Sequence, residues 1–280
     1  MSQPCVTTGT MLCIDTHAHV FTRDLPLADV RRYAPTYDVT VEQYIARLDA
    51  HGMSHGVLVQ PSFLGSDNSY LLAAIARYPQ RLRGIAMIDA DISEQQLLAL
   101  QAGGVVGIRF NLVGGAPVPD FTGVWRSTLA RIAQLGWQVE IHREAVDLPR
   151  VLPPLLAMGL KVVVDHFGRV DAALGVDDPG FRYLLSTAAG GQVWVKLSAS
   201  YRNGGAEQGQ RFARQAWPLL RAHFGPQRLL WGSDWPHTQH ESLTDYDHSW
   251  QQFTQLVSDA AERGIITGQT AARLFGISIS

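Results

Sequence analysis

The chain has 280 residues, 46% of them hydrophobic, which is enough for one large domain or two small ones. Its net charge is −2 and no basic cluster stands out, so neither nucleic acid nor an anionic membrane is expected as a partner. Two cysteines exclude a disulfide scaffold, and neither a secretory leader nor a membrane span is evident. These features favour a cytoplasmic protein, with residues 1–10 as a flexible N-terminal tail.

Short apolar, β-branched segments recur along the chain, and a longer amphipathic segment follows each of them. Thr40 is predicted to cap the first helix, and Gly52 to end it. The predicted strands are residues 11–15, 56–60, 82–88, 105–110, 137–142, 160–165, 192–197 and 228–232. The predicted helices are residues 40–52, 69–78, 93–102, 124–135, 148–158, 179–188, 208–223 and 246–263, followed by a short helix at 267–276.

Alternating strands and helices predict a parallel sheet with right-handed crossovers. Continuously apolar strands such as KVVVD, residues 161–165, indicate burial on both faces. Eight strand–helix pairs are the number found in a TIM barrel, so we expect a single-domain (β/α)8 fold over residues 11–280. A doubly wound open sheet is the alternative, although no glycine-rich dinucleotide motif follows the first strand.

Polar residues stand at the ends of six of these strands. In a TIM barrel the carboxyl ends of all strands open onto one face, where active sites lie. We therefore expect these side chains to meet around one mouth. In chain order they are Asp15, His17, His19, Arg109, Asn111, Glu140, His142, Asp165, His166, Arg169, Lys196, Ser198, Arg202, Asp234 and His237.

His17 and His19 are two residues apart, which puts both imidazoles on the same side of an extended strand. Two neutral imidazoles can bind one divalent metal ion, with further ligands from later strands such as His142, His166 and Asp234. The alternative is a pair of unrelated surface histidines.

Asp234 follows an apolar strand and is the strongest candidate for proton transfer. We expect partial burial to raise the pKa of this carboxyl, which would suit a base acting near neutral pH. A structural aspartate that caps the following turn is the alternative. For His166 the alternative is a buried histidine hydrogen-bonded to a neighbour.

Three arginines, Arg109, Arg169 and Arg202, are expected at the same mouth. A guanidinium matches a carboxylate in a bidentate pair, so three of them would suit an anionic substrate. Each arginine could instead pair with a local acid. Tyr33, in the long first loop, either reaches over the mouth or packs within the loop.

Five segments, IDTHAHVF, RRYAPTYD, GIRFN, VDHFGR and WGSDWPH, resemble the signatures of the amidohydrolase superfamily, in its amidohydrolase-related branch. The resemblance covers nearly the whole chain and is strongest to the lactonases of 2-pyrone-4,6-dicarboxylate and to related lactone or dicarboxylate hydrolases. It implies that the catalytic residues are Asp234, His17, His19 and His166. It implies that the substrate-binding residues are Arg109, Arg169, Arg202 and Tyr33.

The resemblance leaves the cofactor open. Metal-dependent members have a ligand at the position of His142, so one zinc ion held by His17, His19, His142 and Asp234 is one expectation. The pyrone lactonases act without metal, which is the other. Arg109 stands on the fourth strand with no lysine or glutamate, which argues against a carboxylate-bridged pair of metal ions. The segment LVGGAPV after that strand lacks a basic residue found in the pyrone lactonases.

The expected activity is hydrolysis of a carboxylic ester bond in a carboxylate-bearing lactone, within aromatic compound catabolism. Asp234 takes a proton from water and returns it to the leaving oxygen, while His17, His19 and His166 polarise the carbonyl. A small anionic substrate is the expected partner of a monomer or homodimer. Two alternatives are a metal-dependent decarboxylase of an aromatic acid and a non-catalytic barrel that binds an anionic metabolite.

Overall fold

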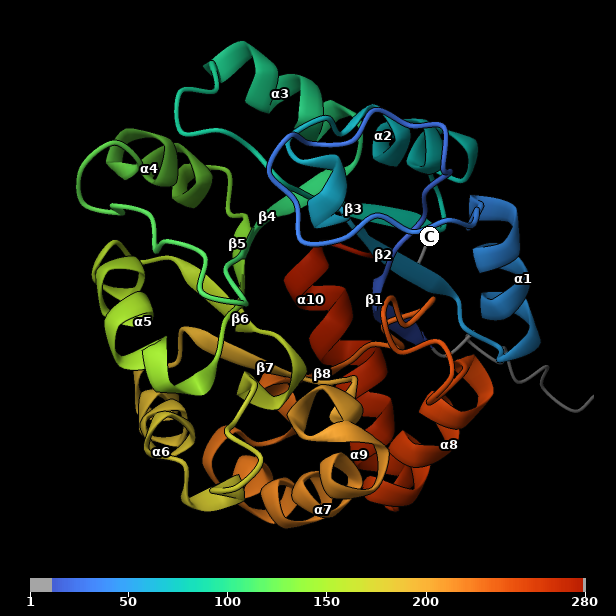
Figure 1. Ribbon diagram of the computed structural model, residues 1–280, viewed down its shortest axis with the longest axis vertical. Helices are drawn as coiled ribbons and strands as arrows, with labels where there is room; N and C mark the ends of the chain where they lie inside the picture. Colours follow the sequence, from blue (N-terminus) through green and yellow to red (C-terminus); the bar gives the residue numbers. More distant parts are fainter. Residues whose placement is uncertain (1–11, 279–280) are drawn as a thin grey trace, which may run out of the picture.

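Eight parallel strands form a nearly closed barrel with helices around it in the computed structural model, which describes residues 12–278 (Figure 1). Strands that are neighbours in the sequence are also neighbours in the sheet. The strands are β1 Ile14–Ala18, β2 His55–Val59, β3 Leu82–Ala86, β4 Val105–Asn111, β5 Gln138–His142, β6 Lys161–Val164, β7 Val193–Leu197 and β8 Leu229–Trp231. The prediction of a (β/α)8 TIM barrel is therefore confirmed, whereas the predicted tail, residues 1–10, lies outside the described residues.

The barrel closes between β1 and the segment that follows β8. Ala18 and Trp235 form a parallel bridge, and the amide of Asp234 donates to the carbonyl of His17 at 2.8 Å. The buried Asp15 carboxylate accepts from the amide of Ser233 at 2.8 Å and from its hydroxyl at 2.7 Å. These bonds fix the loop of Asp234 against the strand that carries His17.

The helices cover the outside of the barrel (Figure 1). Two of them begin with the capping box, at Thr40 as predicted and at Ser93, which satisfies the first free amides of each helix. The helices are α1 Val41–Ala50, α2 Ser69–Arg77, α3 Glu94–Ala102, α4 Arg126–Gln134, α5 Leu148–Ala157, α6 Pro179–Ser186, α7 Gly205–Phe224, α8 Tyr246–Leu256, α9 Ala260–Gly264 and α10 Ala271–Phe275. Within residues 12–278, no helix has the length and apolar character needed to cross a membrane.

Three predicted elements show how the structure differs from the prediction. The first strand lies three residues later than predicted, because the buried residues up to Ala18 pair with β2 and with the loop after β8. The long helix predicted for residues 246–263 is divided, because α8 ends at Leu256 and the side chain of Asp259 caps a new helix, α9. The short last helix is a π-helical turn, Ile265–Thr270, that continues into α10.

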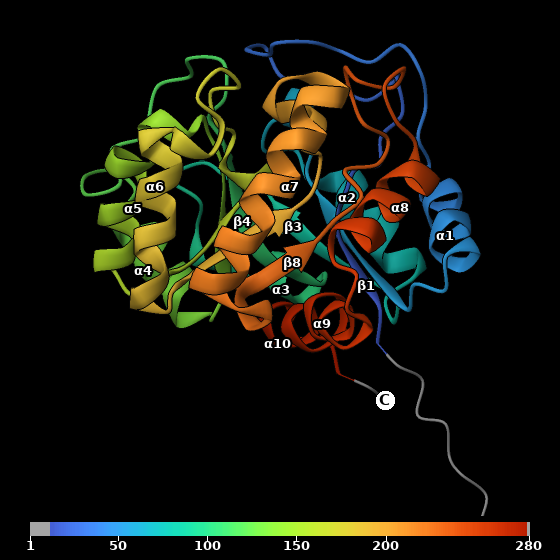
Figure 2. The same cartoon turned by 90° about the horizontal axis from the view of Figure 1, so that it is seen from below.

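The lower half of the barrel interior is apolar. Inward-facing residues of the strands, such as Val59 and Val163, pack in one cluster with Leu274 and Phe275 of α10. Figure 2 shows α9 and α10 under the barrel, at the end opposite the long loops. The apolar end is therefore covered, and polar side chains in the interior lie toward the carboxyl ends of the strands.

Candidate active site

Side chains from three strands converge on one carboxylate oxygen. Asp234 Oδ1 lies 3.6 Å from Nε2 of His17 and 3.8 Å from Nε2 of both His19 and His166. All four side chains are buried. Within the described chain, Asp234 Oδ1 and the Nε2 atoms of His17 and His166 have no hydrogen-bond partner. These atoms are directed at one another across a space where a reactant can bind.

The backbone of the loops after β6 and β8 is in the left-handed region. Asp234 has a φ of 61°, His166 of 52° and Phe167 of 58°. Such conformations cost about 1–3 kcal/mol each in non-glycine residues and cluster at functional sites. They turn His166 and Asp234 toward the middle of the barrel immediately after their strands end.

The second oxygen of Asp234 is tightly held. Its Oδ2 accepts from the Tyr201 hydroxyl at 2.5 Å and from Arg202 Nε at 2.8 Å. Burial alone would raise the pKa of the Asp234 carboxyl, but the Arg202 guanidinium and then the neighbouring imidazoles outweigh burial and hold the pKa well below its usual range. The expected raised pKa is therefore wrong, because the sequence does not show that Arg202 reaches this carboxylate. Asp234 is ionised at neutral pH.

The partners of Nδ1 determine what each imidazole presents to the pocket. His19 Nδ1 lies 2.7 Å from the carbonyl of Val59, and a carbonyl only accepts, so a neutral His19 presents a lone pair at Nε2. His166 Nδ1 lies 2.9 Å from the Ser198 hydroxyl, which can donate or accept. Burial lowers the pKa of His166 to about 3, so this ring is neutral.

A buried set of charges lies beneath the imidazoles. Lys196 Nζ contacts Glu140 Oε1 at 2.6 Å, His17 Nδ1 at 3.0 Å and Asp165 Oδ1 at 3.5 Å. Arg109 donates from Nε to Asp165 at 3.0 Å and from Nη2 to His142 Nδ1 at 2.7 Å. Burial raises the pKa of Glu140 to about 7, and the Lys196 ammonium opposes that rise. Two cations and two carboxyl groups thus occupy the barrel interior together.

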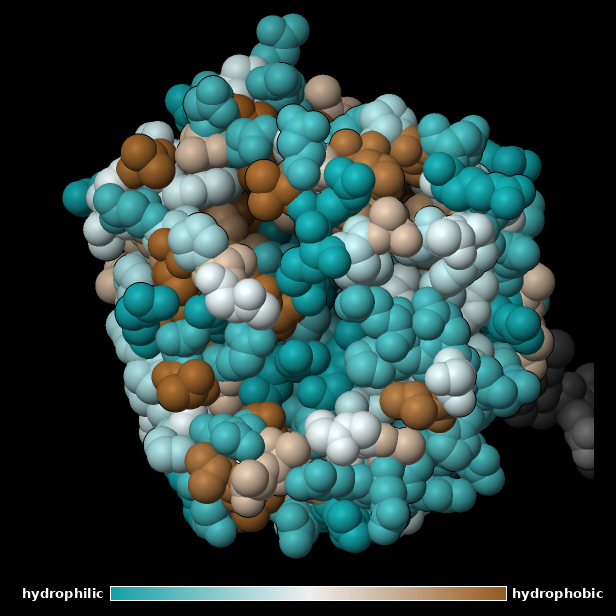
Figure 3. Space-filling view, viewed as in Figure 1, coloured by the Kyte–Doolittle hydropathy of each residue, from teal (hydrophilic) through white to brown (hydrophobic). Residues whose placement is uncertain are grey.

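The mouth of the pocket is basic. Arg32, Tyr33, Arg109 and Arg202 line it beside His19, His166 and Asp234. Burial and the charges of Arg109 and Arg202 lower the pKa of Arg32, so these cations repel one another. Figure 3 shows hydrophilic side chains gathered around a hollow in the middle of this face. An anion in the hollow would relieve the repulsion.

The structure brings most of the residues expected at the mouth together. Tyr33 lies on the pocket wall, where its hydroxyl is 3.0 Å from the Thr238 hydroxyl. Arg109 lines the pocket, but two of its nitrogens bind Asp165 and His142. Arg169 is not among the lining residues and lies 3.9 Å from Glu144.

Tyr201 and Arg32 were missed from the sequence. Tyr201 immediately precedes Arg202, and Arg32 immediately precedes Tyr33. Adjacency to a predicted site residue is the only signal in the sequence that could have found them. A side chain of residue 114 would crowd Arg32, since Arg32 Cδ lies 3.2 Å from where a Cβ on Gly114 would stand. Arg32 thus lies over the loop after β4, the segment LVGGAPV that has no basic residue of its own.

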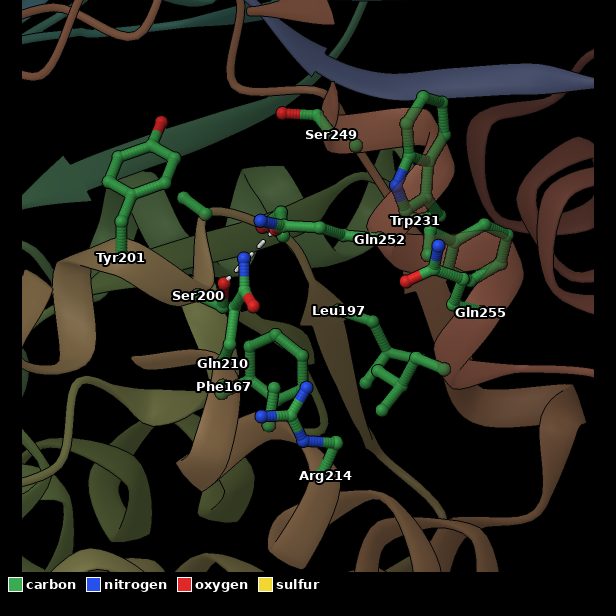
Figure 4. A pocket seen from close by; sticks show the side chains of 16 residues that line it. Phe167, Leu197, Ser200, Tyr201, Gln210, Arg214, Trp231, Ser249, Gln252 and Gln255 are labelled. Carbon is green, nitrogen blue, oxygen red and sulfur yellow. Dashed lines mark hydrogen bonds between the residues drawn. The ribbon is translucent and has the colours of Figure 1, made fainter. Parts of the chain in front are cut away.

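A second cavity, of about 140 Å³, lies behind the site between α7 and α8 (Figure 4). Aromatic side chains such as Phe167 and Trp231 line it together with the amides of Gln210 and Gln252. In Figure 4 the ring of Tyr201 is directed away from these amides. The turn Ser200–Asn203 lies between this cavity and the pocket that holds Asp234, since Tyr201 lines the cavity and its hydroxyl binds Asp234.

The side chains of His17, His19 and Asp234 fit one divalent ion by position, because their ligand atoms lie within 4.8 Å of one another. The position of the ring hydrogen on His17 does not fit a metal ion. An ammonium only donates, so Lys196 places the hydrogen of a neutral His17 on Nε2, where an ion would need a lone pair. Burial and the Lys196 charge also hold the pKa of His17 well below its usual range. His142, predicted as a ligand, belongs to neither close group of possible ligands in the described chain.

Relatives of this chain include lactone hydrolases. A 2-pyrone-4,6-dicarboxylate hydrolase of Comamonas testosteroni is 37% identical over 236 residues, which cover 80% of this chain and 76% of that protein. A 4-sulfomuconolactone hydrolase of Hydrogenophaga intermedia is 31% identical over 272 residues, 94% of this chain and 88% of that protein.

Solved structures agree. An Acinetobacter baumannii protein, provisionally assigned as a 2-pyrone-4,6-dicarboxylic acid hydrolase and solved with citric acid bound, superposes with a TM-score of 0.91 at 42% identity. The match covers 95% of this chain and all of that one. A 2,6-dihydroxybenzoate decarboxylase from Rhizobium, at 16% identity and a TM-score of 0.69, shares the fold alone. Residues 14–277 match the amidohydrolase family, and the chain belongs to that family.

Proposed function

We propose that this protein hydrolyses a carboxylate-bearing lactone similar to 2-pyrone-4,6-dicarboxylate. One observation carries the proposal: an ionised carboxylate, with one oxygen that has no partner among residues 12–278, faces three imidazoles at 3.6–3.8 Å beneath a mouth lined by arginines. The names of the related lactone hydrolases support the same reaction.

In this mechanism Asp234 Oδ1 accepts a proton from water, and the hydroxide forms a bond to the lactone carbonyl carbon. His19 Nε2, with its lone pair, accepts a hydrogen bond from the same water. His17 and His166 face the carbonyl oxygen and stabilise the charge that develops on it. The bond from that carbon to the ring oxygen then breaks, and Asp234 returns its proton to the leaving oxygen. The product is an open-chain acid with one more carboxylate than the lactone.

Substrate carboxylates bind the cations of the mouth. Arg32, Arg109 and Arg202 line the pocket, and Arg169 extends the positive charge beyond it. Tyr33 completes the wall with its hydroxyl. Arg202, Arg109 and Arg169 already lie within 4 Å of Asp234, Asp165 and Glu144, so the inference that the substrate carries more than one carboxylate rests on Arg32 and on the related 2-pyrone-4,6-dicarboxylate hydrolase.

The protein is further proposed to act in the cytoplasm, in aromatic compound catabolism, as a monomer or homodimer without nucleic acid or membrane partners. A zinc ion held by His17, His19 and Asp234 is the alternative state of the site. A metal-dependent decarboxylase and a non-catalytic binding protein are the alternative functions, and the basic mouth favours neither over a lactonase.

A lactone panel at constant pH tests the proposal, with and without a chelator. We expect acid release from dicarboxylated lactones, no carbon dioxide, and the same rate after chelation. Carbon dioxide release would support the decarboxylase, and binding without turnover would support the binding protein. A rate that is lost on chelation and restored by zinc would identify the zinc form.

A further inference from the structure

Lys196 is a buried lysine for which the proposed reaction has no direct use. Its side chain is fully buried in the barrel, beneath the ring of His17 and away from the mouth. Three acceptors surround its ammonium: Glu140 Oε1 at 2.6 Å, His17 Nδ1 at 3.0 Å and Asp165 Oδ1 at 3.5 Å. The ammonium donates hydrogen bonds to Glu140 and His17, and Asp165 lies at ion-pair distance.

The contact with Lys196 determines which nitrogen of His17 carries hydrogen. Because Nδ1 accepts from the ammonium, the ring hydrogen of a neutral His17 is on Nε2, 3.6 Å from Asp234 Oδ1. His17 therefore presents an N–H group to the pocket, whereas His19 presents a lone pair. An N–H group can donate a hydrogen bond to a lactone carbonyl, whereas a divalent ion binds a nitrogen lone pair.

The opposite tautomer has a partner ready. Asp165 Oδ1 lies 3.5 Å from His17 Nδ1 and has no hydrogen-bond partner in the described chain. Without the ammonium, His17 Nδ1 would donate to this carboxylate and leave a lone pair on Nε2. That carboxylate–histidine arrangement is the one that orients histidine ligands of metal ions.

We propose that Lys196 is a positioning residue that fixes His17 as a hydrogen-bond donor to the lactone carbonyl and keeps its Nε2 from binding a divalent ion. The role at the carbonyl rests on the proposed lactone hydrolysis. The effect on the tautomer and on metal binding does not, because both follow from the contacts around Nδ1 alone.

The test compares the wild type with Lys196→Met and with the double variant Lys196→Met/Glu140→Gln. The double variant removes one positive and one negative group, which protects the fold against an unpaired buried charge. Lys161→Met is the matched control. Lys161 is exposed at the start of β6, at the other end of the barrel from the site, and contacts the carbonyl of Gly136.

The first readout is the long-range ¹H–¹⁵N spectrum of the histidine rings, with the His17 signals assigned by loss in His17→Gln. We expect hydrogen on Nε2 in the wild type and the control, and on Nδ1 in both Lys196 variants. The second is zinc binding by competition with a chromophoric chelator, where the Lys196 variants should bind at least tenfold more tightly. The third is lactone hydrolysis, where loss of one donor to an oxyanion lowers kcat by about 10²–10³-fold with little change in KM.

Hydrogen on Nδ1 of His17 in the wild type, or an unchanged ring spectrum in both Lys196 variants, would overturn the proposal. Equal zinc affinity in all four proteins would also overturn it. A wild type that hydrolyses no lactone but shows the expected change in tautomer and zinc affinity would instead refute the proposed function and leave the positioning role of Lys196 supported.

Discussion

Replacing Asp234 with asparagine removes the proposed base and keeps the shape of the side chain. An amide cannot accept the proton of the attacking water at neutral pH. In the described chain, the other carboxylate beside the His17 ring is that of Asp165, which lies on the Nδ1 side and is bound by Arg109. No second carboxylate is therefore available in the described pocket.

The structure indicates the size of both effects. Loss of a general base lowers a rate by about 10²–10⁴-fold, and the lack of a second carboxylate favours the upper end, about 5 kcal/mol in activation free energy. Breaking a buried ion pair costs about 3–5 kcal/mol of folding stability. The loss here should be smaller, because the amide oxygen still accepts from Tyr201 and Arg202.

The assay is base uptake at constant pH with a dicarboxylated lactone, alongside calorimetric binding and urea unfolding. Asp234→Asn should bind the lactone nearly as well as the wild type and turn over at least a thousandfold more slowly. Asp245→Asn is the control, because this exposed aspartate caps α8 by accepting from the amide of His248 at 2.7 Å, and asparagine caps equally well. Turnover by Asp234→Asn within tenfold of the wild type would refute the assignment of the base.

Three further predictions concern the mouth, the buried histidines and the packing behind the site. Arg32→Ala should raise KM for a dicarboxylated lactone about tenfold or more and leave kcat unchanged, because a charge-assisted hydrogen bond worth about 1.5–3 kcal/mol is lost. An unchanged KM in Michaelis measurements would show that Arg32 binds no carboxylate. Burial lowers the pKa of His166 to about 3 and that of His237 to about 4. As the pH falls, both rings therefore take up a proton in the unfolded chain before they do so in the folded protein. The folding stability present above about pH 6.5 should fall toward pH 4 by about 1.4 kcal/mol per pH unit for each ring. Glu140, with a pKa raised to about 7, gains stability over the same pH range and offsets the loss from about one of the two rings. Equal free energies of urea unfolding at pH 7 and pH 5 would contradict the expected net loss of stability. Gly209→Ala should cost about 1–3 kcal/mol in urea unfolding and lower kcat, because its Cβ would lie 2.1 Å from a backbone carbonyl oxygen of the turn that carries Tyr201 and Arg202; unchanged values of both would contradict this packing.

The barrel and its mouth could be predicted because their signals are local. Each strand is a short apolar segment, and most of the functional side chains stand at or just after the end of one. His17, His166 and Asp234 could thus be placed together from strand ends alone, since parallel strands bring those ends to one face.

The electrostatics of the site could not be predicted in the same way. Whether Arg202 binds a substrate or holds Asp234 depends on the turn Ser200–Asn203, which follows β7 and returns toward the loop after β8. The sequence shows which charges approach the mouth, but not which of them pair. The expectation for the pKa of Asp234 failed for this reason, and the contact between Lys196 and His17 was not foreseen.

The interior charges also constrain how this barrel can diverge. Lys196, Glu140, Asp165 and Arg109 are almost completely shielded from water, and each contacts an oppositely charged member of the set. Mutation of one member alone strands a charge in the interior. A descendant that acquires a different chemistry must therefore pass through coordinated, charge-balanced replacements, and covariation among these four positions should record that history.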